Sequence, residues 1–313
     1  MTSPSENAYV WAWLPDATSP VVAGRISRHG NGYRFAYGES YLSRPEAISL
    51  YAPELPLRPG WIDAPEGLDM AGCLRDASPD SWGQRVIIAR LTGLLGAAAD
   101  QITLDKLTFL LESGSNRIGA LDFQRSPTEY VPRSHTATLD ELHAAADALQ
   151  AGKLREELAT ALVDGTAVGG ARPKVLVAEG QIQYIAKLST SADPYPVVKA
   201  EAVGLELARR VGVSTPASRV IRSLGRDVLL VERFDRPGGR RAMLVSGLTM
   251  LGFGDFLGAR YSSYPELLDV LRQSSASGKT WGARCSSGSS SISRSATPTI
   301  MPATTLRSGT AST

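Results

Sequence analysis

The sequence predicts an α+β protein with a β-rich N-terminal part, a second part that mixes strands and helices, and an unstructured C-terminal tail. Strand-like alternation with turn signals dominates residues 9–42. Helical periodicity and short apolar strands alternate from there to about residue 275. Residues 294–313 contain no acidic and no aromatic side chain.

Composition and charge exclude several classes of protein. Hydrophobic residues make up 43% of the 313 residues, enough for a sizeable core, and the formal net charge of +2 argues against a nucleic-acid face built from bulk basicity. Cys73 and Cys285 have no metal-like spacing, which favours a reducing compartment without disulfides. The chain has neither an apolar run of about 18 residues nor a signal peptide, so we expect a cytoplasmic protein without membrane contact.

The beginning of the chain is expected to form a small antiparallel sheet. Asn31-Gly32 is a strong hairpin-turn signal between two of the alternating segments. The strand-like segments are residues 9–14, 20–27 and 32–42.

Two helices and a further strand complete a predicted domain of residues 1–125. Ser78 or Asp80 provides the N-cap of an amphipathic helix that ends near Gly93. The remaining elements are a short helix over residues 105–114 and a strand over residues 117–124.

After a linker over residues 125–138, a second domain is predicted over residues 135–277. Thr138 and Glu141 have the spacing of a capping box that opens a helix. The elements that follow are a helix over 154–163, a Gly-rich loop and two strands over 164–189, a helix over 197–212, two strands around Gly225 and a helix over 262–275.

The Gly-rich loop has the features of a phosphate-binding loop. Gly165, Gly169 and Gly170 allow the backbone to approach a ligand and to present N–H groups to it. Arg172 and Lys174 add positive charge directly after the loop. A tight turn before a strand explains the same glycines equally well.

A strand lysine is followed by a helix glutamate. Lys187 interrupts an apolar strand, and Glu201 lies on the next predicted helix. This order matches the ion pair that positions phosphates in kinases. The alternative is an exposed strand lysine and a solvated glutamate, like Lys199 and Glu206 on the same helix.

A third motif follows a buried strand over residues 228–231. The strand ends in Glu232, Arg233 and Phe234. In a two-lobed kinase the strand that leaves the small lobe supplies backbone groups for the adenine, and an apolar side chain there covers the ring. The alternative is a strand end at which Arg233 and Asp235 are simply solvated.

In this order, the motifs resemble those of the HipA family of serine/threonine protein kinases, the toxin half of HipBA-type toxin–antitoxin pairs. The resemblance extends from Tyr9 to about Ser275. The motifs that carry it are Ser78–Arg85, Gly114–Phe123, Gly169–Lys174, Ile185–Ser189 and Val231–Arg236.

The resemblance implies a kinase-like small lobe that binds ATP. It also implies Mg in intact members, a small helix-turn-helix antitoxin of HipB type as partner, DNA contact only through that antitoxin, and a substrate in the translation machinery. The implied cofactor-binding residues are Val168, Gly169 and Gly170 in the phosphate loop, Lys187 at the phosphates, and Glu232 and Phe234 at the adenine.

The chain departs from the family at two places. Family members often carry a serine, whose autophosphorylation ejects the loop, where this chain has Ala167; whether the adjacent Thr166 replaces it stays open. The family's catalytic Asp and metal-binding Asn and Asp follow the helix that ends here near Gln273, in a motif N-x-D-D-H-x-x-N. No Asp, Glu, His or Asn occurs after Asp269. No catalytic or metal-binding residue is therefore assigned.

We interpret the tail as the product of a shifted reading frame. Joining the last base of each codon to the first two bases of the next restricts the shifted codons tightly, because most residues fix their first two bases. From Cys285 to Gly309 the allowed codons include FERIVFNIAVGNTDDHARNHAAFW, a string that this protein does not contain and that holds the missing motif. A natural low-complexity linker is the alternative.

This hypothesis places the break at residues 276–281. It makes residues 278–313 a frameshifted, disordered tail, because they have too little apolar area to offset the ordering entropy. The C-terminal helical lobe would then be largely missing, and we expect exposed apolar surface around residues 244–257.

Three functions remain open at this point. The first is an ATP-dependent kinase toxin by resemblance that is itself inactive, with weak Mg-independent nucleotide binding at most. The second is a non-catalytic antitoxin- or nucleotide-binding remnant. The third is an unrelated nucleotide-binding enzyme with acidic metal ligands, for which Asp76, Asp80 and Asp235 are the candidates.

Overall fold

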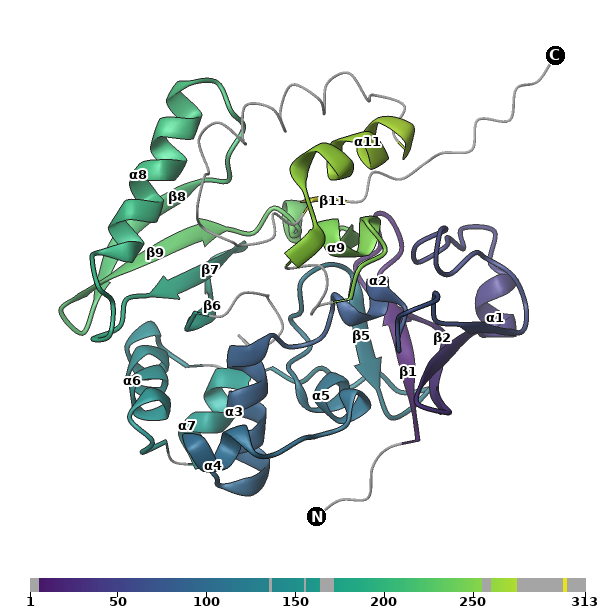
Figure 1. The fold of residues 1–313 in the computed structure, drawn as a ribbon, viewed down its shortest axis with the longest axis horizontal. Coiled ribbons are helices and arrows are strands. Elements are labelled where there is room, and N and C mark those ends of the chain that lie inside the picture. Colours follow the sequence, from purple (N-terminus) through teal and green to yellow (C-terminus); the bar gives the residue numbers. More distant parts are fainter. Residues whose placement is uncertain are drawn as a thin grey trace.

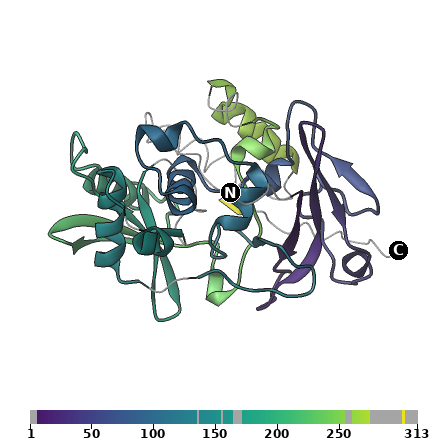
Figure 2. The ribbon, with the colours of Figure 1, turned by 90° about the horizontal axis from the view of Figure 1, so that it is seen from below.

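Two antiparallel sheets lie at opposite ends of the molecule, with helices between them (Figure 1, Figure 2). The computed structural model describes residues 6–134, 137–154, 156–163, 172–254, 260–274 and 301–302. The arrangement confirms the α+β class. In the part of the chain so described, no helix is long and apolar enough to cross a membrane.

The first sheet has the strand order β4-β3-β2-β1-β5. Alternate residues of its strands face a core, among them Val10, Ile26 and Phe35, which are at most 1% exposed. The strands are β1 (Asn7–Ala12), β2 (Val21–His29), β3 (Gly32–Tyr37), β4 (Trp61–Asp63) and β5 (Leu121–Gln124).

These strands and the segments between them, residues 7–124, form the first unit, and three of its predicted boundaries differ in the structure. The β2–β3 loop is Gly30–Asn31 and not Asn31–Gly32, because Gly30 supplies the positive φ of 57°. The strand predicted to residue 42 ends at Tyr37, and helix α1 (Glu39–Leu42) turns the buried Tyr41 ring into the core. The strand predicted from residue 117 begins only at Leu121, after a loop in which Gly119 has a φ of 77°.

Four helices lie between β4 and β5 along the chain. Asp80, not Ser78, caps α3, because its side chain accepts a hydrogen bond from the Gly83 N–H at 2.7 Å. The helix ends at Gly93, as predicted, and Gly93 has the left-handed conformation. The helices are α2 (Gly72–Arg75), α3 (Ser81–Thr92), α4 (Ala97–Asp100) and α5 (Lys106–Glu112).

The second sheet has the order β6-β7-β9-β8. Its strands are β6 (Lys174–Glu179), β7 (Ile182–Leu188), β8 (Ser218–Ser223) and β9 (Arg226–Glu232). Helices α6 (Leu139–Gln150) and α7 (Glu156–Leu162) cover one face, and α8 (Val197–Arg210) lies on the other (Figure 1). The predicted capping box between Thr138 and Glu141 is present at the start of α6.

Helix α3 of the first unit also packs against the second sheet and its helices. Its residues Trp82 and Val86 pack into the core beneath the second sheet, against residues of α6 and α7 and of β6, β7 and β9. Its residues Ile87 and Ile88 pack instead with Phe109 of α5. One helix therefore contributes to both sides of the boundary.

The segment expected to expose apolar surface is largely covered where it is described. Leu244 and Val245 are 8% and 2% exposed, and Val245 belongs to the core of the first unit. The expectation is wrong here because α9 packs on α2 and α11. The elements of this region are the short 3-10 helix η2 (Pro237–Gly239), β10 (Leu244–Val245), α9 (Gly247–Met250) and α11 (Tyr264–Ser274).

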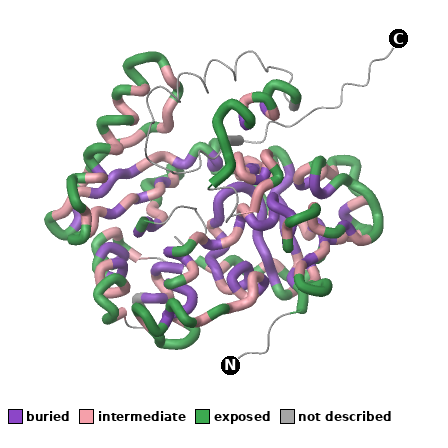
Figure 3. Tube along the Cα trace, viewed as in Figure 1, coloured by how far each residue is buried: buried purple, intermediate pink, exposed green. Residues whose placement is uncertain are grey.

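Exposed apolar side chains gather instead on α8, which is green and pink along its length in Figure 3. Val203, Leu207 and Val211 are 57%, 56% and 74% exposed. Val203 and Leu207 are four residues apart and lie on one side of the helix, and Val211 directly follows its last residue.

Little of the predicted tail is described. Met301–Pro302 form the two-residue strand β11, which pairs antiparallel with β10. The rest of residues 278–313 lies outside the described residues.

Candidate nucleotide site

The expected lysine–glutamate ion pair joins β7 to α8. The Lys187 ammonium donates a hydrogen bond to the Glu201 carboxylate, and the two side chains are 31% and 37% exposed. Helix α8 is held against the sheet by the buried Val198 and by the ion pair of Lys199 with Asp227 at 3.0 Å. Neither Glu201 nor Lys199 is therefore a merely solvated helix residue.

The Gly-rich loop precedes the second sheet. Its predicted functional residues lie outside the described residues: Gly165, Thr166, Ala167, Val168, Gly169 and Gly170. The described exit of the loop carries Arg172, which pairs with Asp193 at 2.6 Å. Part of the positive charge expected beside the loop is thus matched by a carboxylate.

Lys174 and Lys187 lie directly opposite each other on β6 and β7. Like charges in this arrangement repel each other, so each lysine requires its own carboxylate. Lys187 has Glu201, and Lys174 has Asp80 at 2.6 Å. Burial lowers the pKa of Lys174, although Asp80 opposes that shift.

Asp80 therefore has two roles, since one oxygen caps α3 and the other accepts from Lys174. This contact joins the motif Ser78–Arg85 to the motif Gly169–Lys174, which lie far apart in the sequence.

The predicted adenine residues lie at the end of β9. The Glu232 N–H donates to the Ala217 carbonyl at 2.8 Å, and Glu232 is paired with Tyr184 of β7. Lys187 pairs with Leu229 of the same strand, three residues before Glu232, or ~10 Å along the strand. Phe234 follows with 42% of its surface exposed. Lys187 and the strand end thus belong to one pair of adjacent strands.

The residues beside Phe234 are not solvated, contrary to the alternative considered from the sequence. Arg233 and Asp235 are 3% and 0% exposed, and Arg236 is 7% exposed. Burial would raise the pKa of Asp235, but the Arg233 and Arg236 guanidinium groups outweigh it and lower that pKa. Arg233 and Arg236 reach the loop Asn116–Gly119 of the first unit.

Sequence reasoning did not identify this contact. The available signal was the charge density of Val231–Arg236, in which four of six residues are charged.

The acidic residues proposed as metal ligands are each engaged elsewhere. Asp76 accepts from the Ser246 N–H and hydroxyl groups, Asp80 pairs with Lys174, and Asp235 pairs with two arginines. No group of three or more His, Cys, Asp or Glu side chains within the described ranges is arranged to hold a metal ion. The described residues therefore do not support the third hypothesis.

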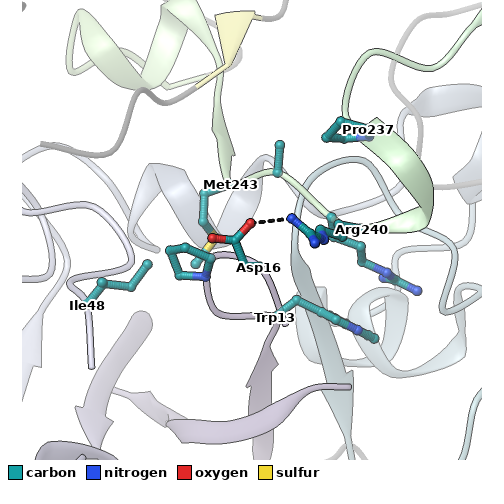
Figure 4. Close-up of a pocket in the computed structure, with 9 residues that line it drawn as sticks. Trp13, Asp16, Ile48, Pro237, Arg240 and Met243 are labelled. Atoms are coloured by element: carbon teal, nitrogen blue, oxygen red, sulfur yellow. Dashed lines mark hydrogen bonds and ion pairs between the residues drawn. The ribbon is translucent and has the colours of Figure 1, made fainter. Parts of the chain in front are cut away.

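A cavity of about 370 Å³ lies between the loops that follow β1 and α1 and the segment Pro237–Met243 (Figure 4). Arg240 and Asp16 form an ion pair of 2.5 Å at its wall, and the Arg241 guanidinium lies 3.5 Å from the centre of the Trp13 ring. None of the predicted site residues lines this cavity.

Two domain profiles of one protein family match this chain. The sequence profile of the HipA N-terminal domain matches residues 17–124, and the profile of the HipA-like C-terminal domain matches residues 166–284. A comparison with curated protein sequences found no match.

A solved structure shares the fold. It is HipA in the complex of HipA, HipB and operator DNA from the toxin–antitoxin system of Shewanella oneidensis MR-1. The similarity covers 89% of this chain and 67% of that chain, with a TM-score of 0.58 and 17% sequence identity. Since the two profiles match residues 17–124 and 166–284 in this order, the chain belongs to the HipA family.

Proposed function

We propose that this chain is a HipA-type, ATP-dependent serine/threonine kinase toxin by descent, and that its second sheet retains the nucleotide-binding half of the site. The ion pair of Lys187 with Glu201 is the observation that carries this proposal. In phosphoryl transfer such a pair holds the lysine at the phosphates. Both side chains are partly exposed, so a ligand can reach them.

The remaining roles follow the geometry of the strand pair. Glu232 and Phe234 at the end of β9 would hold the adenine, since Phe234 is exposed and its neighbours are fixed. Val168, Gly169 and Gly170 would cover the phosphates with backbone N–H groups.

We further propose that the chain as written does not transfer phosphate. The residues after Asp269 offer no general base and no metal ligand. The match to the HipA-like C-terminal domain ends at residue 284, which lies after the break that we place at residues 276–281. Positioning and electrostatic stabilisation supply almost all of the catalysis of phosphoryl transfer, so the loss of base and metal together abolishes it.

The test compares the chain as written with a repaired gene, in which one base is inserted within codons 276–281 so that the neighbouring frame is read. Both products are incubated with Mg and γ-labelled ATP, and ATP binding is measured with and without Mg. We expect the chain as written to bind ATP weakly without transfer, and the repaired chain to transfer phosphate in a way that Lys187→Ala abolishes. If the chain as written transfers phosphate and its Lys187→Ala variant does not, the proposed inactivity is contradicted. Absence of ATP binding in both would overturn the nucleotide site.

A second function, a non-catalytic antitoxin-binding module, is favoured by the first unit. Its core is closed and its sequence matches the HipA N-terminal domain. The partner would be a small helix-turn-helix antitoxin of HipB type, and DNA would be contacted only through it. A kinase substrate in the translation machinery would apply to the repaired chain alone.

The module is tested by a pull-down with the antitoxin-like protein encoded next to this gene. Stable binding without a phosphorylated product supports it. A chain that does not retain the partner at micromolar concentration contradicts it.

A further inference from the structure

The four residues that follow β9 form a turn with one side chain outside and three inside. The Arg236 N–H donates to the Arg233 carbonyl at 3.3 Å, which closes the turn. The side chains of Arg233, Asp235 and Arg236 are at most 3% exposed, whereas Phe234 is 42% exposed. The outward direction of the Phe234 ring is therefore fixed by its neighbours.

Within the turn, one carboxylate holds two guanidinium groups. Arg233 donates to the two oxygens of Asp235 at 3.0 and 2.8 Å, and Arg236 donates to one of them at 2.7 Å. Two positive charges and one negative charge are thus buried together. Such a group is tolerated only when further acceptors satisfy the remaining donors.

The first unit provides these acceptors. Arg233 donates to the Asn116 side-chain oxygen at 2.9 Å and to the Arg117 carbonyl at 2.6 Å. Arg236 donates to the same Asn116 oxygen at 3.1 Å and to the Gly119 carbonyl at 2.9 Å. In return, the Gly119 N–H donates to Asp235 at 2.8 Å.

Asn116 also connects the turn to the second sheet. Its amide nitrogen donates to the Gln183 side-chain oxygen at 3.1 Å, and the Gln183 carbonyl accepts from the Arg233 N–H at 2.9 Å. Gln183 lies on β7, the strand of Lys187. One half-buried side chain of the first unit thus contacts both the turn and the strand that carry the predicted nucleotide residues.

We infer that Asn116 and the turn Arg233–Arg236 position the adenine-binding end of the site, so that the first unit controls recognition of the base. This inference rests on the proposed nucleotide site and adds a positioning role to a segment outside the second sheet. Lys187 stands apart from the turn, bound to Glu201, so the phosphate end of the site does not depend on Asn116.

The test measures the affinity of the full chain for ATP and for inorganic tripolyphosphate, which lacks the base. Asn116→Ala removes the acceptor shared by both arginines. We expect it to weaken ATP binding about tenfold, a change of about 1.4 kcal/mol, and to leave tripolyphosphate binding within about twofold. Asn116→Asp keeps the acceptor oxygen for both arginines but cannot donate to the Gln183 oxygen, so ATP affinity should fall less than in Asn116→Ala.

The matched control is Asp147→Ala, which removes the ion pair of α6 with Arg226 at the other end of β9. It should leave both affinities unchanged. Equal ATP affinity in Asn116→Ala and the unchanged chain would overturn the inference, and so would a parallel loss of both ligands, because general loosening explains that result. If Asn116→Ala does not fold, Asn116→Ser, which keeps a shorter acceptor, should show a smaller loss confined to ATP. If the unchanged chain binds neither ligand, the proposed nucleotide site fails and the inference fails with it.

Discussion

Two ion pairs of the molecule differ in their exposure to solvent. At α8, Lys187 and Glu201 are 31% and 37% exposed and have each other as partners. At the turn after β9, the side chains of Arg233 and Asp235 are 0% and 1% exposed and are surrounded by acceptors and donors of the first unit. A half-exposed pair contributes little to stability and can exchange its partner for a ligand. A buried ion pair has to be completely hydrogen-bonded, and it thereby fixes the segments that supply its hydrogen-bond partners.

The comparison extends to apolar residues. The side of the second sheet that faces α6 and α7 is closed by a core of buried side chains, including Leu142 and Leu230. Helix α8 on the other side has Val198 as its buried residue among the described ones, while Leu207 remains 56% exposed. The buried contacts of the second sheet therefore lie on the side of α6 and α7, and the side of α8 is the more exposed one.

The largest effect is expected from Arg117→Ala. Arg117 is completely buried, donates to Asp122 at 2.7 Å and to the Ala77 carbonyl at 3.0 Å, and also contacts the Leu110 carbonyl. Its removal should lower the free energy of unfolding by about 3–5 kcal/mol, measured by urea denaturation. The control Arg125→Ala removes an arginine that is 61% exposed and pairs with Glu112, and should cost at most about 1 kcal/mol. Equal costs would show that burial does not separate the two kinds of ion pair.

A smaller effect, with a dependence on pH, is expected from Asp235→Asn. The folded pKa of Asp235 lies below its unfolded value, near 3.9 for an ordinary aspartate, so Asp235 stabilises the fold above that value. This contribution is lost as the pH falls through the folded pKa. At pH 7 the variant should be less stable by about 1–3 kcal/mol, because two buried guanidinium groups lose their charged partner.

The measurement is the urea midpoint of both proteins between pH 7 and pH 3. The difference between them should shrink as the pH falls below about 4. The lowered pKa of Asp122 adds a further acid-sensitive contribution to both proteins, so the unchanged chain should lose stability in the same range. A difference that stays constant with pH would show that the charge of Asp235 is not what stabilises the turn.

Glu201→Gln should affect binding more than stability. Because the pair is partly exposed, its loss should change the free energy of unfolding by at most about 1 kcal/mol. ATP affinity should fall about fivefold, since Lys187 is no longer held by a charge. The control is Glu206→Gln on the same helix, where Glu206 pairs with Arg209 and with Arg210. If both variants bind ATP equally, the role of Glu201 is wrong.

The smallest effect is expected from Leu207→Gln on the exposed side of α8. It should change the free energy of unfolding by less than about 0.5 kcal/mol, because the side chain already faces solvent. The contrasting variant Leu230→Ala, at a residue that is 1% exposed on β9, should cost about 2–5 kcal/mol. Thermal denaturation of both variants compares their losses of stability. A large cost at Leu207 would mean that this side of α8 is covered.

Most of the fold was predictable because local signals and burial agree. Alternation predicted β1, β2 and β3, and Thr138 with Glu141 predicted the start of α6, since a capping box needs only residues three apart. The predicted boundaries were wrong where a single residue decided the local conformation against the alternation of apolar and polar residues. Gly30 and not Gly32 provides the left-handed loop position, and Tyr41 left the predicted strand because its ring packs into the core.

The candidate site was predictable in part. The order of lysine and glutamate predicted their ion pair, because a strand followed by a helix on one face brings Lys187 to Glu201. The buried contact of Arg233 with Asn116 was not predicted, since 117 positions separate them and no local rule relates two charged segments so far apart.

The sequence by itself determined the family, the order of the elements, and the residue types that a nucleotide site needs. Local propensity, caps and motif order are encoded within a few residues, so they can be identified before folding. Only the tertiary structure decided which charges are buried. It placed Arg233, Asp235 and Arg236 against the first unit and left Lys187 beside solvent. The physical reason is that the cost of a buried charge depends on acceptors that distant parts of the chain supply.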